Sequence, residues 1–237
     1  MRMDKRFSAL IMSVLLVASA SQAWAVVYGG IDFPQGPSSF ADAVELYNPS
    51  YSGGNVPTAA SYMDPIAALG TPNYVNPNGS VSLGSGGLIQ LLFVNNLLTN
   101  SGGTGYDLHI FEIGPDVEDT FVAIRPTAAT AGLLGSGWDA NNDGFFEIGR
   151  VFGATSSIDI DSIFSGYGAG VLQFSAVQLI DDPNEGSTSG STVGADIDAV
   201  GAIASVRQNV VPEPGTLLLL GSGLVGLAGY GRKRRKA

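Results

Sequence analysis

Short runs of apolar and β-branched residues, separated by clusters of Gly, Pro, Asn and Asp, recur through the middle of the chain. Such runs predict β-strands, because β-branched and aromatic side chains suit a pleated, half-buried surface. No sustained 3.6-residue periodicity competes with them. The runs are 81–83, 88–94, 106–113, 120–125, 145–152, 158–160, 171–180 and 198–206. We therefore predict an all-β domain that folds as a jelly-roll-like β-sandwich.

Two segments favour helix instead of strand. Residues 39–46 combine helix-forming residues with Ser39 as a cap, and residues 64–69 form a second, shorter candidate. Two polar, Gly-rich segments, 95–105 and 182–193, predict long exposed loops between strands.

The charge of this domain limits its partners. Residues 26–211 contain three Arg and no Lys against 19 acidic residues, a net charge of −16. A body with no basic footprint is excluded as a nucleic-acid-binding protein. The chain has no Cys, so it has no disulfide, no thiol nucleophile and no Cys-ligated zinc. Its 186 residues are enough to bury a substantial core.

The first 25 residues have the pattern of a secretory signal peptide. Basic residues precede an apolar stretch, 7–20, and a small-x-small site, Ala23-Trp24-Ala25, follows it. The stretch has 14 residues, short of the roughly 20 that a membrane anchor, the alternative, needs. We predict an N-terminal signal helix that is removed by cleavage after Ala25.

The last residues form a three-part tail at 212–237. A short motif is followed by an uncharged apolar span, 217–230, and then by a basic cluster. The span predicts a transmembrane helix, and the basic cluster is expected to stay on the cytoplasmic side. The motif residues are Val211, Pro212, Glu213 and Pro214, and the basic residues are Arg232, Lys233, Arg234, Arg235 and Lys236.

This tail closely resembles the PEP-CTERM sorting signal of Gram-negative bacteria, with motif, span and basic end in the same order. The resemblance implies recognition by an exosortase, a membrane-embedded cysteine transpeptidase, and removal of the tail. It also implies a host that makes extracellular polysaccharide, an inner-membrane anchor before processing, and a cell-surface or extracellular location afterwards. An ordinary single-pass anchor is the alternative. Tails of this kind are sometimes labelled ice-binding, but the body lacks the regular Thr arrays that ice-binding faces need.

The body resembles a recurring domain of PEP-CTERM and other bacterial cell-surface proteins. The similar segments are 68–72 (ALGTP), 81–89 (VSLGSGGLI), 106–112 (YDLHIFE) and 195–203 (ADIDAVGAI). His109 and Ala195 depart from that pattern. The resemblance implies a jelly-roll sandwich at the cell surface and no defined activity.

Catalytic patterns are scarce. His109 is the sole His, and its alternation with Asp107 and Phe111 predicts a structural side chain on a strand. No Gly-x-Ser-x-Gly motif accompanies it. Glycoside hydrolysis by paired carboxylates remains an alternative, although nothing selects one pair. We predict a protein that is not an enzyme.

Calcium is the cofactor that the sequence favours most. Asp139, Asn141 and Asp143, followed by Gly144, match the front half of an EF-hand-type loop. Arg150 occupies the position of the usual bidentate Glu, so Glu147 or another carboxylate would have to complete the shell. The alternative is a solvated Asp-Gly turn in a β-hairpin.

Two further sets of residues are candidates for binding. Acidic residues that alternate with apolar ones predict partly buried carboxylates that need hydrogen bonds or a metal, with solvated Asp on edge strands as the alternative; these are Asp107, Glu112, Asp159, Asp161, Asp196 and Asp198. Aromatic residues in or near loops are candidates for stacking on sugars, with ordinary packing in the core and turns as the alternative; these are Trp138, Tyr47, Tyr51, Tyr62, Tyr74 and Tyr167.

These observations favour an exported protein with a structural or adhesive role in a polysaccharide matrix. A carbohydrate-binding module, assisted by calcium or not, is the main alternative, and a hydrolase is the remote one.

Overall fold

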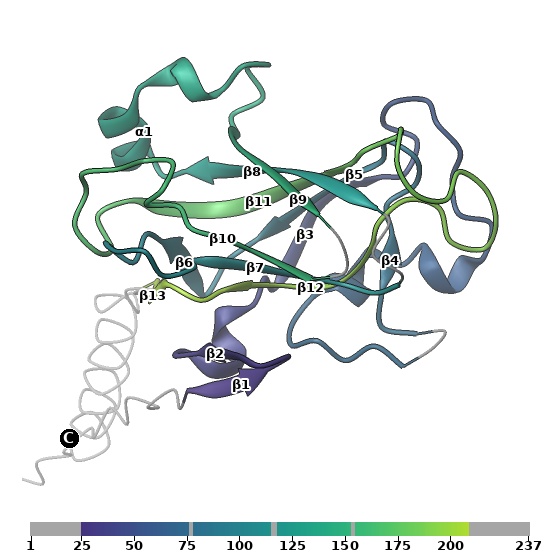
Figure 1. Ribbon diagram of the computed structural model, residues 1–237, viewed down its shortest axis with the longest axis horizontal. Helices are drawn as coiled ribbons and strands as arrows, with labels where there is room; N and C mark the ends of the chain where they lie inside the picture. The colour runs from purple at the N-terminus through teal and green to yellow at the C-terminus, as the bar shows by residue number, and fades with distance from the viewer. Residues whose placement is uncertain (1–24, 76–77, 115–117, 153–154, 209–237) are drawn as a thin grey trace, which may run out of the picture.

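The computed structural model describes residues 25–75, 78–114, 118–152 and 155–208 (Figure 1). The predicted signal helix, the predicted transmembrane helix, the sorting motif and the basic cluster lie outside these residues. Within them strands predominate and helices are short, which confirms the prediction of an all-β domain.

Thirteen strands and five short helical segments make up the described part of the chain. The strands are β1 (Val26–Tyr28), β2 (Ile31–Phe33), β3 (Ala43–Asn48), β4 (Val81–Ser82), β5 (Leu88–Leu92), β6 (Asn96–Thr99), β7 (Leu108–Glu112), β8 (Asp119–Pro126), β9 (Phe146–Phe152), β10 (Thr155–Ile158), β11 (Gln173–Asp181), β12 (Asp196–Ala202) and β13 (Ser205–Arg207). The helical segments are α1 (Ala128–Leu134) and the 3₁₀ turns η1 (Gly36–Ser39), η2 (Ala60–Tyr62), η3 (Pro65–Ala68) and η4 (Ser136–Trp138).

The strands form two antiparallel layers with jelly-roll connectivity. Strands β5 and β6 pair with successive parts of β11 and act as one interrupted strand. One layer has the order β4–β12–β7–β10, and the other contains β5/β6–β11–β8–β9. These eight strands, split between two sheets that the chain visits in turn, are those of a jelly roll. Strands β3 and β13 extend the larger sheet beside β5 and β6.

The core lies between the two layers, whose strands are labelled in Figure 1. Alternate residues of each strand point inward and contact residues of the opposite sheet. The inward residues of the smaller sheet include Leu108, Ile110, Ile197 and Val200, and those of the larger sheet include Ile89, Leu91, Val122, Ile124, Val177 and Leu179. All of them are almost completely buried.

The outer face of the smaller sheet is covered by the N-terminal segment. The β1–β2 hairpin and η1 bring Tyr28, Phe33 and Phe40 onto Phe111 of β7. Phe33 packs directly on the β12 backbone, because a Cβ at Gly201 would lie 2.5 Å from its ring. The aromatic cluster therefore covers the part of this face around Phe111 and Gly201.

The predicted helix at 39–46 is wrong. Ser39 ends η1 instead of capping a helix, and β3 begins at Ala43. Strand β3 pairs with β5 along its length, with a register shift between Val44 and Leu46. Pairing with the sheet and burial of Ala41 outweigh the local helix propensity of this segment.

The predicted loop at 95–105 is also partly wrong, since Asn96–Thr99 forms β6 and pairs with β13 and β11. The second predicted helix is a single 3₁₀ turn, η3, in which Asp64 accepts a hydrogen bond from the Ile66 amide. The 182–193 segment carries no strand or helix, as predicted.

Candidate functional site

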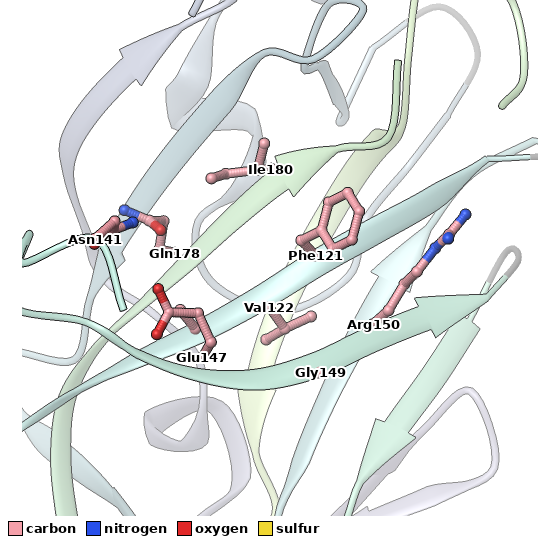
Figure 2. A pocket seen from close by; sticks show the side chains of 9 residues that line it. Phe121, Val122, Asn141, Glu147, Gly149, Arg150, Gln178 and Ile180 are labelled. Carbon is pink, nitrogen blue, oxygen red and sulfur yellow. The ribbon is translucent and has the colours of Figure 1, made fainter. Parts of the chain in front are cut away.

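The outer face of the larger sheet is open and carries a groove of about 420 Å³ over β8, β9 and β11 (Figure 2). Its position follows from strand alternation, because Phe121 and Ala123 face away from the core that holds Val122 and Ile124. The lining residues are Phe121, Val122, Ala123, Asn141, Glu147, Gly149, Arg150, Gln178 and Ile180.

A glycine keeps the middle of the groove open. Gly149 lies opposite Val122, next to a register shift in the β8–β9 pairing. Its φ of 126° is one that other residues rarely adopt, and a Cβ at this position would meet nothing within 4 Å. Position 149 therefore adds no side chain to the middle of the groove.

One end of the groove is polar. Figure 2 shows Asn141, Glu147 and Gln178 gathered there, with Phe121 and Ile180 beyond them and Arg150 at the far end. Gln178 Nε2 donates to Asp143 Oδ2 at 2.9 Å, and the Ala140 amide donates to Glu147 Oε2 at 3.0 Å. Both side chains are thus held in place before any ligand arrives.

The other end combines an aromatic ring with a neutralised cation. Phe121 is 43% exposed, and the Arg150 guanidinium carbon lies 5.3 Å from its ring centroid. Arg150 also forms ion pairs with Asp119 and, at 2.7 Å, with Asp182. These acidic partners leave Arg150 as a packing surface beside the ring.

The four predicted calcium ligands lie in and beside the loop that precedes β9. Asp139 accepts hydrogen bonds from the amides of Asp143 and Gly144, each at 3.0 Å. Asn141 Oδ1 accepts from the Asp143 amide at 3.0 Å, and Glu147 closes the loop through Ala140. The structure thus brings the four residues into one loop, whose side-chain oxygens bind its own backbone. Calcium binding stays a prediction.

The alternative interpretation of this loop, a tight hairpin turn, needs a correction. Asn142 and Gly144 do have positive φ values, 60° and 87°. However, β9 pairs with β8, and the connection between them contains α1 and η4. The Asp-Gly sequence therefore closes a local turn at the end of a long connection, not a two-residue hairpin.

A second group of carboxylates lies at the N-terminal end of β7. Oxygen atoms of Asp107, Asp159 and Asp161 lie within 4.8 Å of one another. Asp107 is fully buried, and its carboxylate accepts from the amides of Ser101 and Ile160 at 2.8 and 2.7 Å. Burial nevertheless raises the pKa of Asp107 to about 6. Backbone amides thus supply hydrogen bonds to this buried carboxylate.

Glu112 is buried and Asp196 is half-buried at the opposite end of the sandwich. Burial, followed by the negative charge of Glu118, raises the pKa of Glu112 to about 9. Burial also raises the pKa of Asp196 to about 6, although Ser82 donates a hydrogen bond to it. Asp198 accepts from the Asn73 amide at 3.0 Å. We therefore expect Glu112 to be protonated at neutral pH.

His109 is enclosed by the fold. Its ring lies under the N-terminal aromatic cluster, 4.5 Å from the Phe111 ring centroid, and its Nδ1 is 2.5 Å from Ser157 Oγ. Its Nε2 is buried and has no hydrogen-bond partner among the described residues. Burial lowers the pKa of His109 to about 4. A neutral, enclosed imidazole is poorly placed to reach a substrate.

The aromatic residues singled out in the sequence do not line the groove. Trp138 packs against Phe164, with ring centroids 4.7 Å apart, and the Tyr47 hydroxyl donates to the Ser82 carbonyl at 2.6 Å. Burial raises the pKa of Tyr47 to about 12. Tyr51 is exposed away from the groove lining. Tyr62, Tyr74 and Tyr167 are likewise not among the lining residues.

Sequence reasoning missed four groove residues, Phe121, Arg150, Gln178 and Ile180. The sequence did contain a signal for Phe121. Phe121, Ala123 and Arg125 occupy alternate positions of a predicted strand and share one face, while Val122 and Ile124 occupy the other face. That pattern places an aromatic ring on the solvent side. The convergence of β8, β9 and β11 on one hollow depends on sheet order, which the pattern does not contain.

No helix in the part of the chain that the structure describes is long and apolar enough to cross a membrane. No curated protein and no solved structure matches the chain. Residues 210–235 match the family model of the PEP-CTERM protein-sorting motif. The motif implies a membrane-anchored, then exported, protein that an exosortase sorts. The chain thus carries a PEP-CTERM protein-sorting motif at its C-terminal end.

Proposed function

We propose that this protein is a non-enzymatic component of the cell surface or its polysaccharide matrix, and that it adheres to extracellular polysaccharide through the groove on the larger sheet. The sorting motif supports the location. The groove, which lies on an uncovered sheet face, supports the contact with a ligand.

The observation that carries the proposal is the pairing of an exposed ring with fixed polar groups. A sugar has an apolar C–H face and a rim of hydroxyl groups. Phe121 and Ile180 offer an apolar surface for the first, while Glu147 and Gln178 offer hydrogen-bonding atoms for the second. Binding sites for small ligands combine apolar walls with a few placed polar groups in this way.

The absence of catalysis is part of the proposal. Hydrolysis of a glycosidic bond generally needs two carboxyl groups about 5–10 Å apart across the bond. Glu147 is the only acidic residue among those that line the groove, and it already accepts the Ala140 amide. A hydrolase remains the remote alternative, and turnover of a polysaccharide or ester that a single Asp or Glu substitution abolishes would establish it.

The test is a glycan array probed with the full chain, with and without calcium. We expect signal on a subset of polysaccharides. A signal no higher than background on every glycan would exclude adhesion through carbohydrate. A signal that needs calcium would favour the calcium-assisted form of the alternative, in which the Asp139 loop orders the polar end of the groove.

Sorting is tested separately from binding. We expect surface material to lack residues 1–25 and most of 217–237 by mass spectrometry. Replacement of Pro212, Glu213 and Pro214 by Ala is expected to leave the precursor in the inner membrane, because the apolar span and the basic cluster remain. An intact C-terminal peptide in the surface fraction would contradict exosortase processing.

A further inference from the structure

We propose that the groove selects a neutral glycan over an acidic one, with Phe121 and Ile180 as the stacking surface and Glu147 and Gln178 as hydrogen-bond acceptors for sugar hydroxyls. This inference rests on the proposed function and specifies the chemical class of its ligand. It follows from the charges and hydrogen bonds of the lining residues.

The groove offers no unpaired cation for an acidic sugar. Arg150 is the one basic residue among the lining residues, and it already contacts Asp119, Asp182 and, at 3.8 Å, Glu185. A uronate or sulfate would have to displace these carboxylates. Recognition of a carboxylate normally uses an Arg whose planar fork is free to bind both oxygens.

The nearest other cation on this face is also paired. Both terminal nitrogens of Arg125 donate to the Glu45 carboxylate, and its guanidinium carbon lies 4.4 Å from the Phe145 ring centroid. The rest of the body adds no Lys, and its net charge is −16. An acidic polysaccharide is therefore repelled at long range and finds no free partner at short range.

The polar end of the groove is rich in acceptors. Glu147 is a carboxylate, and one amide hydrogen of Gln178 is already given to Asp143. No group in the described part of the chain donates to the Gln178 side-chain oxygen in the structure. Asn141 Nδ2 is likewise directed to Asp143, at 3.2 Å. Acceptors of this kind suit the O–H donors of a sugar and are unfavourable beside a second carboxylate.

The apolar half fits the other side of a sugar ring. Phe121 is held in place by Arg150 on β9, so its exposed ring loses little freedom when a ligand binds. Ile180 lies opposite Phe121 in the β11–β8 pairing and extends the same surface. The groove volume of about 420 Å³ is within the usual range for small-ligand sites, roughly 300–1,000 Å³, and suits a short stretch of a chain.

The experiment is calorimetry of the full chain in mild detergent with two panels of polysaccharide. One panel is neutral (a β-glucan, a mannan and a galactan) and the other is acidic (polygalacturonate and alginate), each at 50 and 500 mM NaCl. We expect binding to at least one neutral polysaccharide, with an affinity that changes less than twofold with salt. We expect no binding to the acidic panel at either salt concentration.

The variants locate the site. Phe121→Ala is expected to weaken neutral binding at least tenfold, and Ile180→Ala, on the next strand, at least threefold. Phe152→Ala is the matched control, because Phe152 is exposed and also contacts Arg150 but does not line the groove. Circular dichroism establishes whether each variant is folded. If Phe121→Ala does not fold, the binding of Ile180→Ala decides the test.

The outcomes separate this inference from the proposed function. Binding to acidic polysaccharide that fades at 500 mM NaCl would overturn neutral selection and leave adhesion to polysaccharide intact. Neutral binding that none of the groove variants weakens would overturn the assignment to this groove. No detectable binding to either panel of polysaccharides would contradict the proposed function itself.

Discussion

The two outer faces of the sandwich differ in what covers them. On the smaller sheet, Phe33 of β2 and Phe40 are buried in the aromatic cluster between the N-terminal segment and the sheet, with their ring centroids 4.7 Å apart. On the larger sheet, Phe121 and Phe152 are 43% and 68% exposed and are accompanied by polar groove residues. Aromatic side chains occur on both faces, but Phe33 and Phe40 are buried while Phe121 and Phe152 are exposed.

This difference separates stability from binding. Buried rings contribute to the free energy of folding through the apolar surface that they remove from water. Exposed rings beside fixed polar groups contribute little to folding and remain available to a ligand. We therefore expect substitutions on the covered face to act on stability and substitutions on the open face to act on affinity.

The largest effect is expected for Phe33→Ala on the covered face. Loss of a buried Phe side chain typically costs about 3–5 kcal/mol of unfolding free energy. For a domain of this size that corresponds to a fall in melting temperature of roughly 10 °C. Thermal unfolding followed by circular dichroism measures it, with Val27→Ala, an exposed β1 residue, as the control. A change under about 1 kcal/mol for Phe33→Ala would mean that the hairpin is not part of the cooperative fold.

A pH effect is expected under the same hairpin. Because the pKa of His109 is lowered to about 4 in the folded state, the unfolded state binds more protons between about pH 6.5 and 4. The stability contributed by His109 is therefore lost as the pH falls through this window. We expect acidification from pH 6.5 to 4.5 to cost the wild type roughly 2 kcal/mol more than His109→Leu.

This test compares two proteins because other groups titrate in the opposite sense. Burial raises the pKa of Asp107, Asp181 and Asp196 to about 6. Protonation of these acids therefore stabilises the folded state as the pH falls. They are present in both proteins and cancel in the difference. Urea unfolding at several pH values provides the measurement. Identical pH profiles for wild type and His109→Leu would contradict a buried, neutral imidazole.

An intermediate effect is expected from calcium beside the open face. If the Asp139 loop binds it in the millimolar range usual for extracellular modules, a few mM calcium stabilises the fold by ~1 kcal/mol. The melting temperature then rises by about 2–4 °C, and magnesium has less effect. Differential scanning calorimetry with and without each cation measures the shift.

Two variants locate the cation. Asp143→Ala is expected to abolish the rise in melting temperature, because it removes a ligand while Gly144 keeps the turn. Asp159→Ala tests the other carboxylate group and is expected to keep the rise. If the rise persists in Asp143→Ala and disappears in Asp159→Ala, calcium binds near Asp107 and not in the predicted loop. If wild type and Asp143→Ala respond equally, the loop has no site.

The smallest effect on stability is expected for Phe121→Ala. Its ring is partly exposed and its contact with Arg150 lies at the surface, so we expect a change of about 0.5 kcal/mol. The contrast with Phe33→Ala, measured under identical conditions, is the sharpest test of the division between the two faces. A loss of 3 kcal/mol or more for Phe121→Ala would show that the open face also supports the fold.

The strands were predictable because their signal is local. Alternation places Val122 and Ile124 in the core, and the runs around Leu91, Ile110 and Val177 each became a buried strand. The prediction for residues 39–46 was wrong because the segment has helical propensity, while its neighbours in space are strands. Only the pairing of β3 with β5, which joins residues 40 to 49 positions apart, decides its structure.

The candidate site was less predictable than the fold. The loop from Asp139 to Glu147 was recognised because its residues are close in sequence and follow a known spacing. The groove brings Phe121, Glu147 and Gln178 together from three strands, and no spacing encodes their proximity. The position of Gly149 matters for what it lacks, which no search for functional side chains can detect.

The last strand has a mechanical consequence. Strand β13 ends at Arg207, and the sorting motif begins at residue 210, so tension between the tail and the body enters the fold at β13. Strand β13 pairs with β6, β6 pairs with β11, and β11 supplies Gln178 and Ile180 to the groove. A load between the C-terminal end of the body and a ligand in the groove would therefore run along the backbone hydrogen bonds of one sheet, without crossing the apolar layer between the sheets.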